Sequence, residues 1–204
     1  EMLDDDERQH LHRQIALALE AVYPDDPAHA PRLVDHWRET GELDREIYYT
    51  RLVVQQALAV SAFPTVLELA LRALARLPDD HIQDRMVLQR TLADAYAGMS
   101  DFDRAQAYYE QSLKIAQTLD DVSEKMSALN GLGRCAVRRN RYEAALNLYE
   151  QARVLAREHK DQRLEAVALR GIGGVRYFYE DYHGAVDFHR QALQVSLMAE
   201  DASE

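Results

Sequence analysis

Apolar residues recur along the chain at helical spacing, and their pattern repeats about every 40 residues. Within residues 129–152, two amphipathic helical runs are joined by a short polar turn at residues 139–141. Shifting this stretch by 40 residues in either direction aligns it with the chain again. The aligned sets are Tyr142 with Phe102 and Tyr182, Ala145 with Ala105 and Ala185, and Tyr149 with Tyr109 and His189. Such self-similarity is typical of a helical solenoid, in which stacked hairpins bury their apolar faces against one another.

The pattern predicts an all-α fold, a right-handed superhelix of helical hairpins with about ten helices. The expected helices cover residues 7–22, 29–40, 43–60, 64–77, 81–98, 102–118, 122–139, 142–158, 162–179 and 182–199. In the first of them, apolar residues recur at helical spacing and mark its apolar face. They are Leu11, Ile15, Ala18, Leu19 and Val22.

Four repeats of two helices each are expected at residues 47–85, 86–125, 126–165 and 166–204. Residues 1–46 do not fit the repeat frame, so they are expected to form a separate N-terminal helical segment. Small residues are predicted where two helices cross closely, because only a small side chain fits there. These positions are Gly133, Gly173, Ala105, Ala145 and Ala185.

Three residue pairs indicate capping boxes, in which an N-cap residue and the residue three positions later satisfy each other's backbone amides. The pairs are Asp80 with Gln83, Asp121 with Glu124 and Asn140 with Glu143. Residues 201–204 have the same form as residues 121–124, so a further helix is expected to start there. The preceding helix is apolar for the end of a solenoid, and self-association through this edge is a hypothesis. Its apolar residues are Val186, Leu193, Val195, Leu197 and Met198.

The net charge of −11 argues against a nucleic-acid partner and against an anionic membrane surface, because both attract basic proteins. The chain has 47% apolar residues, but they form no run long enough to suggest a transmembrane helix. Cys135 is the single cysteine, so no disulfide can form within the chain, and a cytoplasmic location is predicted.

No motif in the sequence predicts catalysis, a metal site or a cofactor. The eight histidines show no metal-ligand spacing. The glycine-rich run at residues 171–174 lacks the preceding strand and the following Gly-Lys-Ser/Thr of a phosphate-binding loop. Its glycines are expected at helix-packing positions of the repeat. The chain is therefore predicted not to be an enzyme.

The aligned aromatic and small positions resemble the tetratricopeptide repeat (TPR) over residues 47–204, because they agree in three successive copies. The large aromatic of the first TPR helix is present as Tyr96, but Ala136 and Arg176 stand at the equivalent places. Units of 40 residues are longer than the usual TPR of about 34. They are similar to the long-repeat subclass of Leu-Gly-Asn-type polarity adaptors and of sensor domains in bacterial signalling ATPases.

Residues 11–26 and 36–42 resemble the junction that leads from the ATPase region of bacterial STAND-type proteins into their TPR units. This resemblance implies that the chain is a piece of a larger bacterial signalling ATPase or transcription regulator. The implied function is a non-catalytic interaction or sensor domain that binds a protein or peptide partner.

The TPR resemblance also implies a concave groove, lined by the first helix of each repeat. The candidate partner-binding residues are Arg51, Gln55, Arg90, Asp94, Asn130, Arg134, Arg170 and Tyr177. A row of arginines can bind carboxylates or phosphates bidentately, so an acidic partner is expected. The alternative is that these arginines are structural and pair with neighbours such as Asp94.

A second functional hypothesis is a small-ligand sensor, whose groove binds a metabolite or an oligosaccharide. A deep, aromatic-lined pocket around Tyr177, Phe178 and Tyr179 would favour this hypothesis over a protein partner.

Overall fold

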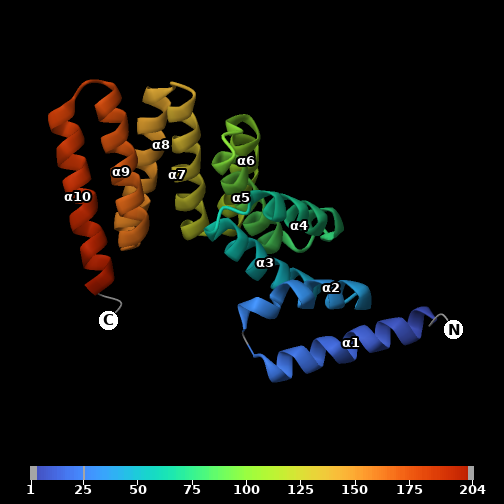
Figure 1. The fold of residues 1–204 in the computed structure, drawn as a ribbon. Coiled ribbons are helices and arrows are strands. Elements are labelled where there is room, and N and C mark those ends of the chain that lie inside the picture. The colour runs from blue at the N-terminus through green and yellow to red at the C-terminus, as the bar shows by residue number, and fades with distance from the viewer. Residues whose placement is uncertain (1–3, 25, 202–204) are drawn as a thin grey trace. The chain divides into compact units, whose positions relative to one another are not determined.

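The computed structural model describes residues 4–24 and 26–201, and these residues form helices without any β-strand (Figure 1). The ten α-helices are α1 (Asp5–Val22), α2 (Ala30–Thr40), α3 (Leu43–Ala59), α4 (Phe63–Arg76), α5 (Ile82–Gly98), α6 (Phe102–Leu119), α7 (Val122–Arg138), α8 (Tyr142–Glu158), α9 (Gln162–Phe178) and α10 (Tyr182–Asp201). A short 3₁₀ helix, η1 (Pro27–His29), precedes α2. Every predicted helix is present with its ends within two residues of the expected positions, which confirms the all-α fold.

The chain divides into two compact units, Glu1–Ala95 and Tyr96–Glu204, called unit 1 and unit 2 below. The predicted boundaries of the N-terminal segment and of the four repeats stay a prediction. The start signal at residues 201–204 falls almost entirely outside the described residues, and Asp201 is the last residue of α10.

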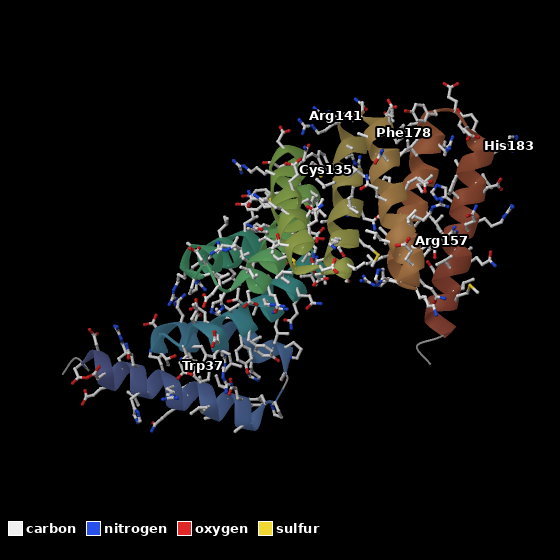
Figure 2. All side chains as sticks on the ribbon, turned by 180° about the vertical axis from the view of Figure 1, so that it is seen from behind. Trp37, Cys135, Arg141, Arg157, Phe178 and His183 are labelled. Atoms are coloured by element: carbon white, nitrogen blue, oxygen red, sulfur yellow. The ribbon has the colours of Figure 1, made fainter. Side chains whose placement is uncertain are left out.

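In unit 1, the carboxylate of Glu20 in α1 binds side chains of both α2 and α3. It accepts hydrogen bonds from Trp37 Nε1 at 3.0 Å and from the Tyr49 hydroxyl at 2.9 Å, and Arg45 Nη1 lies 2.8 Å away. Burial and the hydrogen bond to Glu20 raise the pKa of Tyr49 to about 12. Trp37 is buried beside α1 (Figure 2).

Of the predicted apolar face of α1, Leu19 packs against the cluster that contains Trp37, but much of the rest of that face is exposed. Leu11, Ile15 and Val22 are exposed, whereas Ala16 is buried against Leu33 and Trp37 of α2. Ala16 and Glu20 are four residues apart and therefore lie on the same side of α1. This is the side of α1 that contacts the rest of unit 1.

A buried ion pair in unit 1 joins α3 to α4. The Glu46 side chain is only 1% exposed, and its Oε2 lies 2.8 Å from Nη1 of Arg76, which is 38% exposed. Burial raises the pKa of the Glu46 carboxyl, while Arg76, Arg72 and Arg38 act in the opposite direction. A carboxyl whose pKa is raised on folding stabilises the fold below its unfolded pKa, and this contribution is lost as the pH rises through the folded pKa.

Replacing Arg76 by alanine is expected to lower the free energy of unfolding by about 1–2 kcal/mol at neutral pH. The loss is smaller than for a fully buried partner because Arg76 is partly exposed and Arg72 and Arg38 remain. The substitution raises the pKa of Glu46 further, so the loss should shrink towards about pH 4, where the carboxyl is protonated. Urea unfolding at both pH values measures this. If the R76A protein loses the same free energy of unfolding at both pH values, the role given to the Glu46 ion pair is wrong. The control is the R51A protein, which lacks the arginine of an exposed ion pair.

In unit 2 the helices α7, α8, α9 and α10 lie side by side (Figure 1), and α6 packs against α7. The turns that precede these five helices share one design, in which a residue in the left-handed region is followed by the N-cap residue of the next helix. The left-handed residues are Ser100, Asp120, Asn140, Lys160 and Glu180, with φ between 55° and 64°. Aspartate at the next position accepts a backbone amide hydrogen bond in four of the five turns, at Asp101, Asp121, Asp161 and Asp181.

The three predicted capping boxes have different outcomes. Asp121 is the N-cap of α7 and accepts from the Glu124 amide at 3.0 Å, while its own amide donates to the Ala116 carbonyl. Asn140 was predicted as an N-cap, which is wrong, because Arg141 occupies that position without a side-chain cap. Asn140 has φ 57° instead, a conformation that asparagine tolerates well. Asp80 lies two residues before α5 rather than immediately before it.

Replacing Lys160 by glycine is expected to stabilise the chain by about 0.5–1 kcal/mol. Lys160 has φ 57°, which strains a residue with a Cβ atom, and glycine relieves this strain at a helix C-terminus. The greater freedom of glycine in the unfolded chain offsets part of the gain. The matched control N140G should change little. Thermal melts measure both, and a destabilised K160G protein would contradict the explanation.

The repeat positions of unit 2 are explained by tyrosines that pack against glycines. The ring of Tyr149 in α8 lies between Gly133 of α7 and Gly171 of α9, and a Cβ atom on either glycine would come within 3 Å of it. Tyr109 of α6 lies against Gly131 of α7 in the same way. The predicted small positions at Ala105, Ala145 and Ala185 are also buried. Close packing at the aligned positions therefore underlies the 40-residue pattern.

Candidate binding pocket in unit 2

The four predicted partner-binding residues of unit 1 are mostly engaged in ion pairs. Nη1 of Arg51 lies 2.9 Å from Oδ1 of Asp84, and Nη1 of Arg90 lies 3.0 Å from Oδ2 of Asp94. Gln55 is exposed on α3. The ion pair between Arg90 and Asp94 is the one expected if these arginines are structural and pair with neighbours. The predicted groove through both units stays a prediction.

In unit 2, two of the predicted residues, Arg134 of α7 and Arg170 of α9, line the same pocket. Its volume is about 440 Å³. The residues that line it are Arg134, Val137, Arg138, Asn140, Tyr142, Tyr149, Arg170, Gly171, Gly174 and Phe178. These residues belong to α7, α8, α9 and the turn between α7 and α8. The pocket is called the arginine pocket below.

The other two predicted residues of unit 2 lie outside the arginine pocket. Asn130 is buried in α7, with only 6% of its surface exposed, and its amide nitrogen and oxygen have no hydrogen-bond partner among the described residues. Tyr177 is exposed and lies against the rings of Phe178 and Tyr182. The amide of Asn130 is therefore not accessible in this structure, and its role in partner binding stays a prediction.

The arginine pocket contains three guanidinium groups, and no aspartate or glutamate is among its lining residues. Arg134 donates a hydrogen bond to the hydroxyl of Tyr109 at 2.5 Å. The Arg138 guanidinium lies 6.0 Å from the ring centre of Phe102. Neither Arg138 nor Arg170 forms an ion pair with a carboxylate among the described residues. The pocket is thus a positively charged site on a chain whose net charge is −11.

Two arginines that neighbour the pocket residues in sequence, Arg139 and Arg176, are paired with carboxylates. Arg139 Nη2 lies 2.8 Å from Oδ1 of Asp103, and Arg176 Nη1 lies 3.7 Å from Oδ2 of Asp181. Neither pair involves Arg138 or Arg170, so the charge of these two pocket arginines is available for an external anion.

Aromatic rings form the apolar part of the pocket. The rings of Tyr142 and Phe178 are stacked, with centroids 5.0 Å apart and planes 14° apart. Tyr149 lies deeper and is 6% exposed, and burial raises the pKa of its hydroxyl to about 12. The hydroxyl therefore stays protonated at neutral pH and adds no negative charge to the pocket.

Gly171 and Gly174 lie three residues apart on α9 and have different roles at the pocket. Gly171 makes room for the Tyr149 ring, as expected for a packing position. A Cβ atom on Gly174 would meet no atom within 4 Å, so the expectation that all the glycines of this run are packing positions is wrong for Gly174. The absence of a side chain at residue 174 keeps the space between the arginines open.

A row of exposed aromatic residues continues from the pocket around the turn between α9 and α10. Tyr177, Phe178, Tyr179 and Tyr182 are each at least half exposed. Tyr177 contacts Phe178 and Tyr182 edge to face, and Tyr179 contacts Tyr142 in the same way. Phe178 lies at the same end of unit 2 as Arg141 (Figure 2). These four residues are called the aromatic ridge.

Sequence reasoning missed Arg138 and Tyr142 as site residues, whereas Phe178 was named only for the small-ligand alternative. Arg138 is four residues after Arg134 and therefore lies on the same side of α7, which is a signal that the sequence contains. Phe178 is likewise four residues after Gly174 and lies on the same side of α9. Tyr142 was interpreted only as a packing residue of the repeat. The stacking between Tyr142 and Phe178 joins two helices and has no signal in the sequence.

The part of the chain that the structure describes contains no group of three or more potential metal ligands. Within the same residues, no helix is both long and apolar enough to cross a membrane.

Comparison with known proteins identifies the class. A sequence model of the tetratricopeptide repeat family matches residues 84–158 and 124–197, which together make up more than half of the chain. The chain therefore belongs to the tetratricopeptide repeat family. No curated protein matches the sequence.

Several solved structures share the fold. The apo form of RapI has a TM-score of 0.71 at 13% identity, with 95% of this chain and 72% of RapI covered. A Rap protein complexed with competence and sporulation factor has a TM-score of 0.69 at 15% identity, with 98% of this chain covered. Aspartyl phosphate phosphatase F from Bacillus subtilis has a TM-score of 0.73 at 11% identity, with 97% of this chain covered. This chain spans 57% and 52% of the length of the last two proteins.

Proposed function

We propose that the chain is a non-catalytic interaction module that binds an acidic segment of a protein partner at the arginine pocket of unit 2. The observation that carries this proposal is the pocket itself, with three arginines and no carboxylate on a strongly acidic chain. Membership of the tetratricopeptide repeat family supports an interaction role, and the acidic partner agrees with the expectation from the sequence.

The chemistry of the lining residues suits a peptide side chain with a negative charge. A guanidinium group can bind a carboxylate through two parallel hydrogen bonds, and such charge-assisted bonds are among the strongest in proteins. The rings of Tyr142 and Phe178 offer apolar contact beside that charge. The aromatic ridge extends this contact beyond the pocket, and exposed aromatic residues are common anchors at protein interfaces.

The small-ligand alternative has less support from the geometry. Of the three aromatic residues whose deep pocket would favour it, only Phe178 lines the arginine pocket. Tyr177 and Tyr179 lie exposed on the ridge, where an extended segment can reach them. A peptide partner therefore suits the ridge and the pocket together.

The finer context stays a proposal. In this view the chain is a cytoplasmic sensor domain of a bacterial STAND-type ATPase or transcription regulator, and partner binding biases a switch elsewhere in that protein. The resemblance of residues 11–26 and 36–42 is its support. Self-association through α10 also stays a prediction, supported by Val186, Leu193, Leu197 and Met198, which are each more than half exposed.

A labelled peptide that alternates glutamate with alanine tests the binding function. Fluorescence polarisation with the whole chain should show binding with a Kd of about 10–100 µM at low salt, weakening as salt is added. The same peptide with glutamine in place of glutamate should not bind. Equal binding of the two peptides, or binding of neither, would contradict the proposed function.

A further inference from the structure

Unit 1 contains a small cavity of its own, between the segment that follows α1 and the helices α2 and α3. Its volume is about 110 Å³. Three of the residues that line it are tyrosines, Tyr23, Tyr48 and Tyr49, and one is an acid, Asp26. The other described lining residues are apolar apart from Gln56, and none of them is basic. The cavity is called the tyrosine cavity below.

Contacts within the protein hold all three tyrosine rings in place. The Tyr49 hydroxyl donates a hydrogen bond to the Glu20 carboxylate at 2.9 Å. The Tyr48 ring meets the Tyr49 ring nearly at a right angle, with centroids 4.9 Å apart. The Tyr23 ring is stacked on the ring of His29, with centroids 4.0 Å apart. The rings are therefore positioned before a ligand binds, which lowers the entropy cost of binding.

Asp26 gives the tyrosine cavity a negative charge. Its Oδ1 atom accepts a hydrogen bond from the Ala28 amide at 2.9 Å, and its Oδ2 atom lies 3.7 Å from Nε2 of His29. Among the described residues, no lysine or arginine forms an ion pair with Asp26. Arg45, one turn before Tyr49 on α3, donates to the Glu20 carboxylate instead. The Asp26 carboxylate is therefore available to balance the charge of an external cation.

We infer that the tyrosine cavity binds an organic cation of the alkylammonium class, such as a trimethylammonium group. The face of an aromatic ring is electron-rich and attracts a cation, and aromatic side chains around a quaternary ammonium are a known mode of recognition. Asp26 balances the charge of the ligand, and the apolar walls at Leu33 and Leu52 contact its alkyl groups. This site lies in unit 1 and is independent of the function proposed for the arginine pocket.

The size and the walls of the cavity favour an alkylated ammonium over a primary one. A volume of about 110 Å³ corresponds to about three to four water molecules in the liquid, which is close to the size of a trimethylammonium group. A primary ammonium has three donors and is strongly hydrated, so it would lose water against the apolar walls. A quaternary ammonium has no donor to satisfy. The net charge of −11 on the chain also attracts cations.

The test compares choline with its uncharged carbon analogue, in which a tert-butyl group replaces the trimethylammonium group. Each compound is titrated into the isotopically labelled whole chain at about pH 7.5, above the pKa of a free imidazole, so that an imidazolium does not compete for Asp26. Choline should bind at least tenfold more tightly than the analogue and shift the amides of residues 26–33 and 48–56. Equal affinity, absence of choline binding, or shifts confined to other residues overturns the inference.

Three substitutions assign the preference to the cavity. D26N removes the charge but keeps the cap of η1, because asparagine is as good an N-cap as aspartate, and it should abolish the preference for choline. Y48L replaces a half-exposed ring by an apolar side chain and should reduce the preference. E68Q changes an exposed carboxylate of unit 1 outside the cavity lining, and the preference should persist. A D26N protein that keeps the full preference overturns the inference.

A short peptide with one trimethyllysine distinguishes the two sources of such a cation. If the peptide binds at least tenfold more tightly than choline, the cation belongs to a methylated protein partner. Equal or weaker binding of the peptide assigns the cavity to a free small molecule, and both results support the alkylammonium class. The same peptide with unmodified lysine should bind at least tenfold more weakly than the trimethylated one. Equal affinity of the two peptides overturns the preference for an alkylated cation.

Discussion

Replacing Gly171 by alanine lowers the free energy of unfolding by about 2–3 kcal/mol, whereas the same change at Gly174 raises it by about 0.5–1 kcal/mol. In the G171A protein the added Cβ atom would collide with the buried ring of Tyr149, which Gly133 confines from the other side. At Gly174 the Cβ atom enters open space, so the higher helix propensity of alanine decides the sign.

Urea unfolding of the G171A and G174A proteins measures this pair of effects. Each variant is the control for the other, because both change glycine to alanine in the middle of α9. Effects of the same sign would contradict the packing of Tyr149 described here.

A larger residue in the G174F protein should fill the arginine pocket and weaken binding of the glutamate peptide without unfolding unit 2.

Reversing the charge of Arg138 and Arg170 together is expected to reduce the affinity for the glutamate peptide at least about 100-fold, equivalent to about 2.7 kcal/mol. Each glutamate removes an attractive guanidinium and adds a repulsive carboxylate at the pocket. Stability should change little, because both arginines are exposed and lack carboxylate partners among the described residues.

A matched double variant controls for overall charge. R32E and R163E together change the net charge equally, and both arginines are exposed and absent from the pocket lining. If this control protein loses as much affinity as the R138E/R170E protein, long-range charge and not the pocket governs binding. If the R138E/R170E protein unfolds, the arginines are structural, as the alternative from the sequence holds.

The helices were predictable because burial of apolar residues imposes a period that the sequence shows directly. The turns were less predictable. Asparagine is a common N-cap residue. Asn140 nevertheless occupies the left-handed position of the shared turn, and Arg141 stands where the other turns have a capping aspartate. Choosing between these positions requires the register of the turn, which local sequence does not fix within one residue.

The candidate site was predictable only in part. Arg134 and Arg170 were found from the repeat frame, because equivalent positions of successive units face the same side. Arg51 was expected to be available, but it pairs with Asp84, which lies 33 residues later in the sequence. The pocket itself depends on the open space at Gly174 and on the stacking of Tyr142 with Phe178, and both arise only when α8 and α9 pack together.

Mapping the bound glutamate–alanine peptide on the isotopically labelled whole chain by amide chemical shifts shows where the peptide binds. Shift changes should be concentrated at residues 134–142 and 170–178, with the side chains of Arg138 and Arg170 among the strongest. Changes confined to unit 1 or to α10, with the pocket residues unaffected, would contradict binding at the arginine pocket.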